Sequence, residues 1–145
     1  MDPGPATEPL DRLLVRAGLA LQRFTRRVAD SYGLSATALD VLGALVALDE
    51  VSHRDLAGHL RLAPATLTPV IDALEGAGAL TRVRDETDRR VVRISITPRG
   101  RERYAAAATG VAAAVAGLPA PPSDQAELIR VHLLDLLDAI EREAP

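Results

Sequence analysis

The residues best suited to chemistry in this chain are arginines gathered in one short stretch. Residues 82–103 hold eight of the 17 basic residues, all of which are Arg, against four acids. The chain as a whole is acidic, with a formal net charge of −3. A guanidinium carries a permanent charge and a planar set of donors that matches phosphate or carboxylate. This stretch therefore indicates a local anionic partner, although a solvated turn with Asp85, Glu86 and Asp88 as local ion pairs would give the same pattern.

Composition argues against most other chemistries. The chain has no Cys, which excludes disulfides, thiolate metal sites and cysteine nucleophiles. His53 and His59 are six positions apart, so they do not share a helical face, and His132 has no clustered partner. Neither a nucleophile elbow nor a Gly-rich phosphate loop is present. We therefore expect no enzyme activity, no metal and no cofactor, and the 2% aromatic content argues against stacking on single-stranded nucleic acid.

The arginine-rich stretch is predicted to form a β-hairpin. Residues 81–85 and 91–96 alternate between apolar and polar side chains, which is the pattern of half-buried strands. The polar residues 86–90 between them form a turn, so Arg89 and Arg90 are expected at an exposed tip.

A pair of short helices precedes this hairpin. Ser52 is a capping residue for the first, and Asp55 stands where a capping-box acid belongs. Pro64 fits the first position of the second helix, which runs to about residue 75 and ends at the glycines of residues 76–78. Two short helices followed by a basic hairpin predict a winged helix-turn-helix, in which the second helix enters the major groove of DNA.

Longer helices are predicted on both sides of this unit. One spans residues 8–32, Ser35 caps another, Thr97-Pro98 begins a fifth, and Ser123 caps the last. Their apolar stripes exceed what one small domain can cover, which predicts mutual burial in a two-fold dimer. We thus predict a mainly α protomer over residues 1–145 with a small β-hairpin wing. A winged helix-turn-helix covers residues 34–100, and dimerisation helices cover residues 8–32 and 101–143.

Two motifs resemble the MarR family (multiple-antibiotic-resistance regulators). Residues 88–100, DRRVVRISITPRG, resemble the family's wing signature of Asp-x-Arg, five residues, then Leu-Thr-x-x-Gly, with Ile96 in place of Leu. Residues 65–75, ATLTPVIDALE, followed by Gly78, resemble its recognition helix and the exit from that helix. The resemblance extends over residues 10–143 and includes the order of elements.

The resemblance implies a cytoplasmic, homodimeric transcription factor that binds a pseudo-palindromic DNA duplex. Such proteins are usually repressors and are often released by a small ligand or by oxidation. Arg90 matches the wing arginine that reaches the minor groove, and Asp88 matches the acid that orients it. The other expected DNA contacts are Arg82, Arg84, Arg89 and Arg93 on the wing, Ala65, Thr66, Thr68 and Pro69 on the recognition helix, and Ser52 and Arg54 on the helix before it.

Two departures from the family pattern carry consequences. Residues 63–78 contain no basic residue, whereas family members commonly carry Lys or Arg at the positions of Pro64, Asp72 and Ala73. Bidentate guanine readout by arginine is thus absent from this helix, so we expect reliance on the wing, on hydroxyl and methyl contacts and on DNA shape. The Thr-Leu-Thr-Pro run resembles the organic-hydroperoxide sensors, but the absence of cysteine excludes their mechanism.

Two other functions remain open at this point. The bare recognition helix also fits a dimeric winged-helix interaction protein with weak or no DNA affinity. A ligand-binding protein that uses the cleft between the dimer helices and the winged unit is a further alternative. The N-terminal MDPGPATEP lacks the basic and apolar regions of a secretory signal, and the uncharged residues 105–118 are too short to cross a bilayer. The expected location is therefore the cytoplasm.

Overall fold

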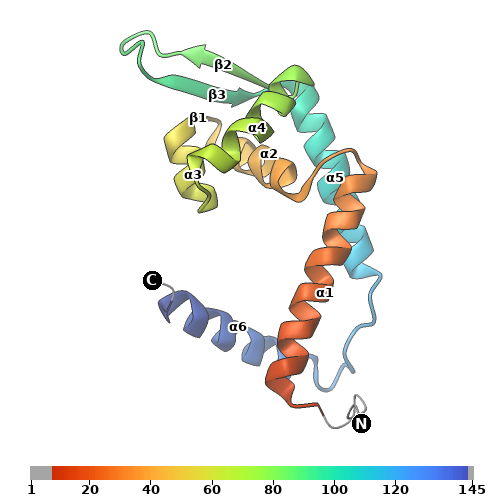
Figure 1. The fold of residues 1–145 in the computed structure, drawn as a ribbon. Coiled ribbons are helices and arrows are strands. Elements are labelled where there is room, and N and C mark those ends of the chain that lie inside the picture. The colour runs from red at the N-terminus through yellow and green to blue at the C-terminus, as the bar shows by residue number, and fades with distance from the viewer. Residues whose placement is uncertain (1–7, 144–145) are drawn as a thin grey trace.

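Residues 8–143, which the computed structural model describes, form six helices and one small sheet (Figure 1). The predicted fold class, mainly α with a β-hairpin wing, is confirmed. Residues 1–7 and 144–145 of the predicted protomer lie outside the described residues. In chain order the elements are α1 (Leu10–Ser31), α2 (Ala36–Leu48), β1 (Glu50–Ser52), α3 (His53–Leu60), α4 (Pro64–Gly76), β2 (Leu80–Arg84), β3 (Val92–Ile96), α5 (Pro98–Ala116) and α6 (Ala126–Glu143).

Three helices begin at the predicted hydroxyl caps. The Ser35 side chain accepts a hydrogen bond from the Ala38 N–H at 3.1 Å, and Ser52 accepts one from the Asp55 N–H at the same distance. The Thr97 hydroxyl accepts from the Gly100 N–H at 3.0 Å. Each cap satisfies a backbone donor that the first turn of a helix leaves free.

The predicted cap of the last helix, Ser123, is wrong. Residues 123–125 form a turn instead, in which the Gln125 N–H donates to the Pro122 carbonyl at 2.9 Å, and α6 starts only at Ala126. The Pro122 carbonyl accepts the Gln125 N–H three residues on, which closes a tight turn directly after the two prolines. The chain therefore completes a separate turn before the helix begins.

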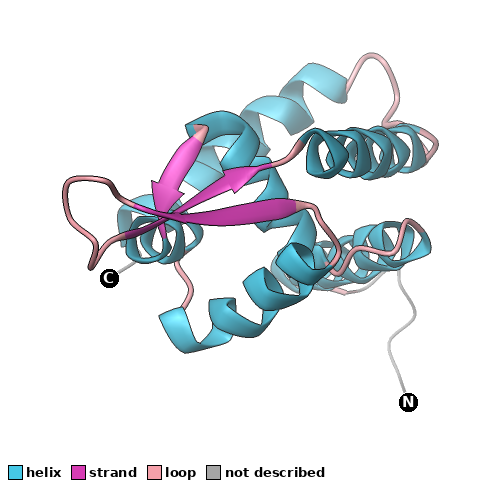
Figure 2. Ribbon diagram, turned by 90° about the horizontal axis from the view of Figure 1, so that it is seen from above, coloured by secondary structure: helices cyan, strands magenta, loops and turns pink. Residues whose placement is uncertain are grey.

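The sheet contains one strand that the sequence did not reveal. It has the order β1-β3-β2, with both pairs antiparallel, so the hairpin of β2 and β3 is extended by Glu50–Ser52. A three-residue segment is too short for alternation to be recognised. Seen from above, the loop of the hairpin projects beyond the helices (Figure 2). This projecting hairpin is the wing.

The hydrophobic core lies in the head of the molecule, formed by α2, α3, α4 and the sheet. α2 supplies its centre, because Val41, Leu42 and Leu45 are fully buried. The other elements close around α2 with Leu56 from α3, Leu67, Ile71 and Leu74 from α4, and Leu80 and Ile94 from the sheet. α3, α4 and the wing therefore pack on one shared hydrophobic core.

The terminal helices bury much less apolar surface. α1 runs alongside α5, while α6 leaves their lower end (Figure 1) and has no buried residue. Leu10 of α1 is 64% exposed and Leu128 of α6 is 74% exposed. None of the described helices is by itself long and apolar enough to cross a bilayer, and α1 and α2 meet the same test only as a pair bent by 79°.

Gly100 joins the wing to α5. A Cβ atom at this position would lie 1.9 Å from the Ala79 carbonyl oxygen, which is far inside van der Waals contact. The same carbonyl accepts the Thr97 N–H at 3.0 Å, and the Thr97 hydroxyl donates to the Gly78 carbonyl at 2.6 Å. Only glycine leaves room for the chain before β2 and the first turn of α5 to meet this closely.

We predict that Gly100→Ala lowers the free energy of unfolding by at least about 2 kcal/mol, because the added methyl must displace backbone. Gly58→Ala is the matched control, since nothing lies within 4 Å of the added atom in α3. Removing glycine from the interior of a helix should raise stability by about 0.5–1 kcal/mol. Urea denaturation of both variants measures the difference, and equal stability of the two would contradict this account of the joint.

Candidate nucleic-acid interface

The residues predicted on the recognition helix all lie at the surface. Ala65, Thr66, Thr68 and Pro69 occupy the N-terminal half of α4 and are exposed, while Leu67 between them is buried. Pro69 has no N–H, so the Ala65 carbonyl loses its partner within the helix. Because Ala65 is exposed, that carbonyl can meet solvent. The exposed face of this half of α4 is therefore uncharged and carries two hydroxyl groups.

A groove of about 630 Å³ separates the start of α3 from the wing. It brings together four residues predicted from the sequence, Ser52 and Arg54 on one side and Arg90 and Arg93 on the other. His53, which was not among the predicted contacts, also lines it. The groove holds three guanidinium groups and one carboxylate, that of Asp55, so its net charge suits an anion.

Asp85 organises the turn at the tip of the wing. Its carboxylate accepts hydrogen bonds from the Thr87 N–H at 2.8 Å, from the Asp88 N–H at 3.1 Å, from the Thr87 hydroxyl and from the Arg93 Nε–H at 2.8 Å. These bonds, that of the Thr87 hydroxyl first and that of Arg93 next, hold the pKa of the Asp85 carboxyl well below its ordinary range. Sequence reasoning missed this role, although an Asp two residues before a Thr in a polar turn is a known turn signal.

Asp88 acts on Arg90 through the backbone. Its carboxylate oxygen Oδ1 accepts the Arg90 N–H at 3.0 Å. Among residues 8–143, no carboxylate forms an ion pair with the Arg90 guanidinium. The resemblance predicts that Asp88 orients Arg90. In this structure, Asp88 fixes the backbone from which that side chain projects.

The wing arginines divide into two groups. Arg82 pairs with Asp72 and with Glu75 of α4, the latter at 2.7 Å, and Arg93 pairs with Asp85 and lies 4.0 Å from Glu50. Within the described part of the chain, the other wing arginines and the arginine of α3 form no ion pair: Arg84, Arg89, Arg90 and Arg54.

The ion pairs of Arg82 also reduce the negative charge that α4 presents at its surface. Asp72 and Glu75 are exposed on the recognition helix and would repel a polyanion if left alone. Arg82 is half-buried and reaches both carboxylates, so the two negative charges are partly offset within the protein. Its guanidinium is occupied in this way, which differs from the free phosphate contact expected from the sequence.

Comparison with known proteins identifies the group to which this arrangement belongs. The model of the MarR family matches residues 34–92. The HTH-type transcriptional regulator YkoM of Bacillus subtilis is 31% identical over 124 residues, which cover 83% of this chain and 79% of YkoM. The chain belongs to the MarR family. Its relatives are named as transcriptional regulators.

Other relatives, all named as HTH-type transcriptional regulators, align over shorter segments. PecS of Dickeya dadantii is 37% identical over 90 residues, which cover 60% of this chain and 54% of PecS. The chain spans 62% and 43% of two further regulators of Bacillus subtilis, YsmB and YdgJ.

Solved structures place the fold among DNA-binding regulators. The transcriptional repressor CouR, bound to a 23-mer DNA duplex, matches with a TM-score of 0.75 and 26% identity over 97% of this chain and 98% of CouR. Wild-type MarR of E. coli matches with a TM-score of 0.74 and 19% identity over 90% of this chain and 97% of MarR, which shows the shared fold. This chain therefore has the winged-helix fold of MarR-family transcriptional regulators.

We predict that Asp85→Ala loosens the wing without unfolding the head, because the carboxylate holds two backbone N–H groups of the turn. Hydrogen exchange of the Thr87 and Asp88 amides should become faster, while Glu86→Ala should leave it unchanged. Since hydrogen bonding lowers the pKa of Asp85, the wild-type turn should stay ordered as pH falls through the ordinary range of aspartate and loosen only below it. Unchanged exchange in Asp85→Ala would contradict this role.

Proposed function

We propose that this chain is a sequence-specific, double-stranded DNA-binding repressor that acts as a homodimer and is released by a small ligand. The observation that carries the DNA-binding part is the set of four arginines without an ion pair among the described residues, on α3 and the wing, beside the exposed hydroxyls of α4. Exposed guanidinium groups that the protein does not neutralise are available to phosphates. The DNA complex of CouR, a protein of the same fold and 26% identity, supports this reading.

Base recognition is divided between α4 and the wing in this proposal. Thr66 offers its hydroxyl to base edges and Thr68 offers its oxygen as an acceptor, while the side chains of Ala65 and Pro69 offer apolar contacts for thymine methyl groups. Arg90 enters the minor groove, where a narrow groove strengthens the attraction for a guanidinium. Ser52 and Arg54 meet the phosphate backbone beside α3, and Arg84 and Arg89 extend these contacts along the wing.

The proposed partner in the dimer is a second copy of the chain, joined through residues 8–32 and 101–143. α6 exposes apolar side chains around its circumference, and an isolated helix of this kind is not stable in water. The charges of the two terminal segments are complementary. Residues 1–30 carry five arginines and four acids, whereas residues 123–145 carry two arginines and six acids. Pairing α6 with the terminal helices of another copy would cover the exposed apolar side chains of both. Residues 34–100 would then act as the DNA-binding unit.

A single charge in α6 tests the dimer. Leu137 is 54% exposed, and we predict that Leu137→Glu shifts the protein to a monomer because a carboxylate would be buried at the interface. Leu48→Glu, at a site 40% exposed in the head, should leave the dimer intact. Sedimentation velocity measures the state of both variants. A wild-type monomer at micromolar concentration, or a dimeric Leu137→Glu, would exclude this interface.

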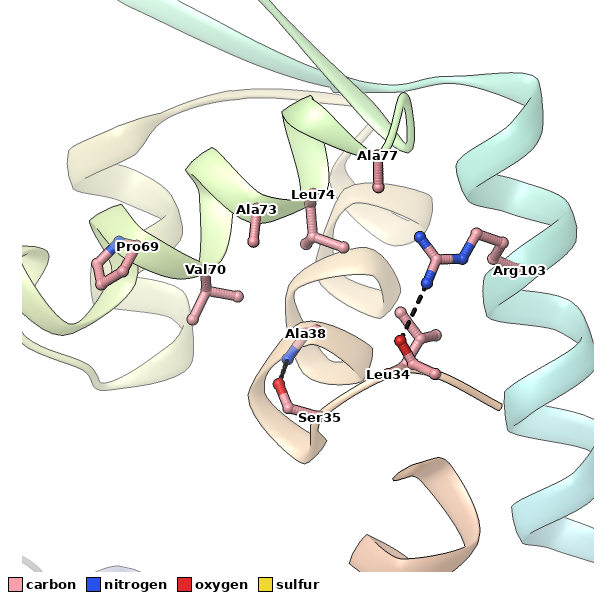
Figure 3. A pocket seen from close by; sticks show the side chains of 10 residues that line it. Leu34, Ser35, Ala38, Pro69, Val70, Ala73, Leu74, Ala77 and Arg103 are labelled. Carbon is pink, nitrogen blue, oxygen red and sulfur yellow. Dashed lines mark hydrogen bonds between the residues drawn. The ribbon is translucent and has the colours of Figure 1, made fainter. Parts of the chain in front are cut away.

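Two hollows are available for a ligand that releases the DNA. One of about 380 Å³ lies between the start of α2, α4 and α5 (Figure 3), where Arg103 crosses from α5 and donates to the Gly33 carbonyl at 3.0 Å. The other, of about 450 Å³, lies between α2 and α5, where burial raises the pKa of Asp40. CouR has been solved with p-coumaroyl-CoA, so a protein of this fold accommodates such a ligand.

The absence of basic residues from the recognition helix favours one competing function, a winged-helix interaction or ligand-binding protein with weak or no DNA affinity. In vitro selection of random duplexes by the wild-type protein at a stated ionic strength separates the two. Recovery of a pseudo-palindrome with half-sites about one helical turn apart supports the repressor. Recovery of no enriched sequence supports the competitor.

Arg90→Ala gives the matching variant. We predict at least about tenfold weaker binding to the selected duplex and a log–log salt slope that is shallower by about 0.9 for each phosphate that the protein no longer neutralises. Arg130→Ala removes the same charge from α6, remote from the wing (Figure 1), and should bind as the wild type does. Fluorescence anisotropy at several salt concentrations measures both. Equal affinity of Arg90→Ala and wild type would refute the assignment of the wing.

A further inference from the structure

His53 links α3 to α4, the two helices of the helix-turn-helix, through a side-chain contact that no sequence motif predicts. It is the first residue of α3 and is half-buried, and its Nε2 lies 3.3 Å from the Thr68 hydroxyl oxygen on α4. The Thr68 hydroxyl donates its single hydrogen to the Pro64 carbonyl at 3.0 Å. With that hydrogen used, the Thr68 oxygen acts as an acceptor, and we assign the hydrogen between the two side chains to Nε2 of His53.

This tautomer leaves Nδ1 of His53 without a hydrogen while the ring is neutral. Protonation adds an N–H at Nδ1 and a positive charge, and it keeps the bond from Nε2 to Thr68 intact. His53 also lines the groove between α3 and the wing, which is where a DNA phosphate lies in the proposed function. His53, whose Nδ1 carries no hydrogen in this tautomer, therefore lines the same groove as Arg54 and Arg90.

The charged groups around this groove decide how it responds to protons. α3 contributes Arg54 and Asp55, whose carboxylate accepts from the Ser52 hydroxyl at 2.8 Å, and α4 contributes the uncharged Thr68. The wing contributes Arg90 and Arg93, and Arg93 is paired with Asp85 and faces Glu50 of β1. The groove thus presents guanidinium groups to an incoming phosphate beside the ring of His53.

We propose that His53 contacts a phosphate of the DNA backbone in its protonated form, so that DNA binding takes up a proton in each groove. The inference rests on the proposed DNA-binding function and adds a proton-linked contact to it. Imidazole is the side chain whose charge ordinarily changes between pH 5 and 8. A group that holds its proton more tightly in the complex than in the free protein makes affinity rise as pH falls.

Fluorescence anisotropy on the labelled duplex recovered by selection tests the proposal at constant ionic strength. The wild-type dimer should bind about tenfold more tightly at about pH 6 than at about pH 8. His53→Gln keeps an amide donor for Thr68 but cannot be protonated, so its affinity should change little between about pH 8 and about pH 6 and should fall well below that of the wild type at about pH 6. His59→Gln, at the other end of α3, should retain the wild-type response.

A second measurement needs no variant. Calorimetric titration of the wild type with the same duplex, in two buffers of different ionisation enthalpy, counts the protons bound. Net uptake supports the proposal. No uptake, a flat wild-type response or an undiminished response in His53→Gln overturns it and leaves the DNA-binding function standing. Weak binding of folded His53→Gln at about pH 8 would make His53 a purely structural support of Thr68 and would also overturn it. Failure of the wild type to bind duplex at any pH would remove both the proposed function and this inference.

Discussion

An acidic protein binds a polyanion more easily where its acids are offset within the contact surface, and the head of this molecule offsets two groups of acids in this way. Arg82 offsets Asp72 and Glu75 on α4, and the Asp85 carboxylate is enclosed by the turn of the wing and by Arg93. Much of the remaining negative charge lies in α6, at the end of the molecule away from the wing (Figure 1). Arg54 of α3 and Arg84, Arg89 and Arg90 of the wing form no ion pair within the described residues.

Features set by local chemistry could be predicted from the sequence. A hydroxyl before an apolar run caps a helix because the free N–H groups of the first turn are its nearest donors, which explains why Ser35, Ser52 and Thr97 were found correctly. The same rule failed at Ser123, where the preceding prolines allow an intervening turn. β1 was missed because three residues carry no readable period, and its pairing depends on β3, which is more than forty residues away.

The partners of individual side chains could not be predicted in the same way. Arg82 and Arg93 were expected to act as phosphate contacts because their sequence positions cannot reveal carboxylates brought close by folding. The contact of His53 with Thr68 joins residues fifteen positions apart on two helices, and no spacing rule connects them. The family signature likewise mixes two kinds of residue. Thr97 and Gly100 hold the base of the wing against α5, whereas Arg90 remains without an ion pair in the described chain.

The close joint between the wing and α5 has a mechanical consequence. The Thr97 hydroxyl caps α5 and donates to the Gly78 carbonyl, and Gly100 lies against the Ala79 carbonyl. The end of β3 and the start of α5 are therefore held directly against the chain that enters β2. Farther along the chain, α5 packs beside α1. We therefore expect helix and hairpin to move as one unit, so that a tilt at the far end of α5 would be transmitted to the arginines of the wing.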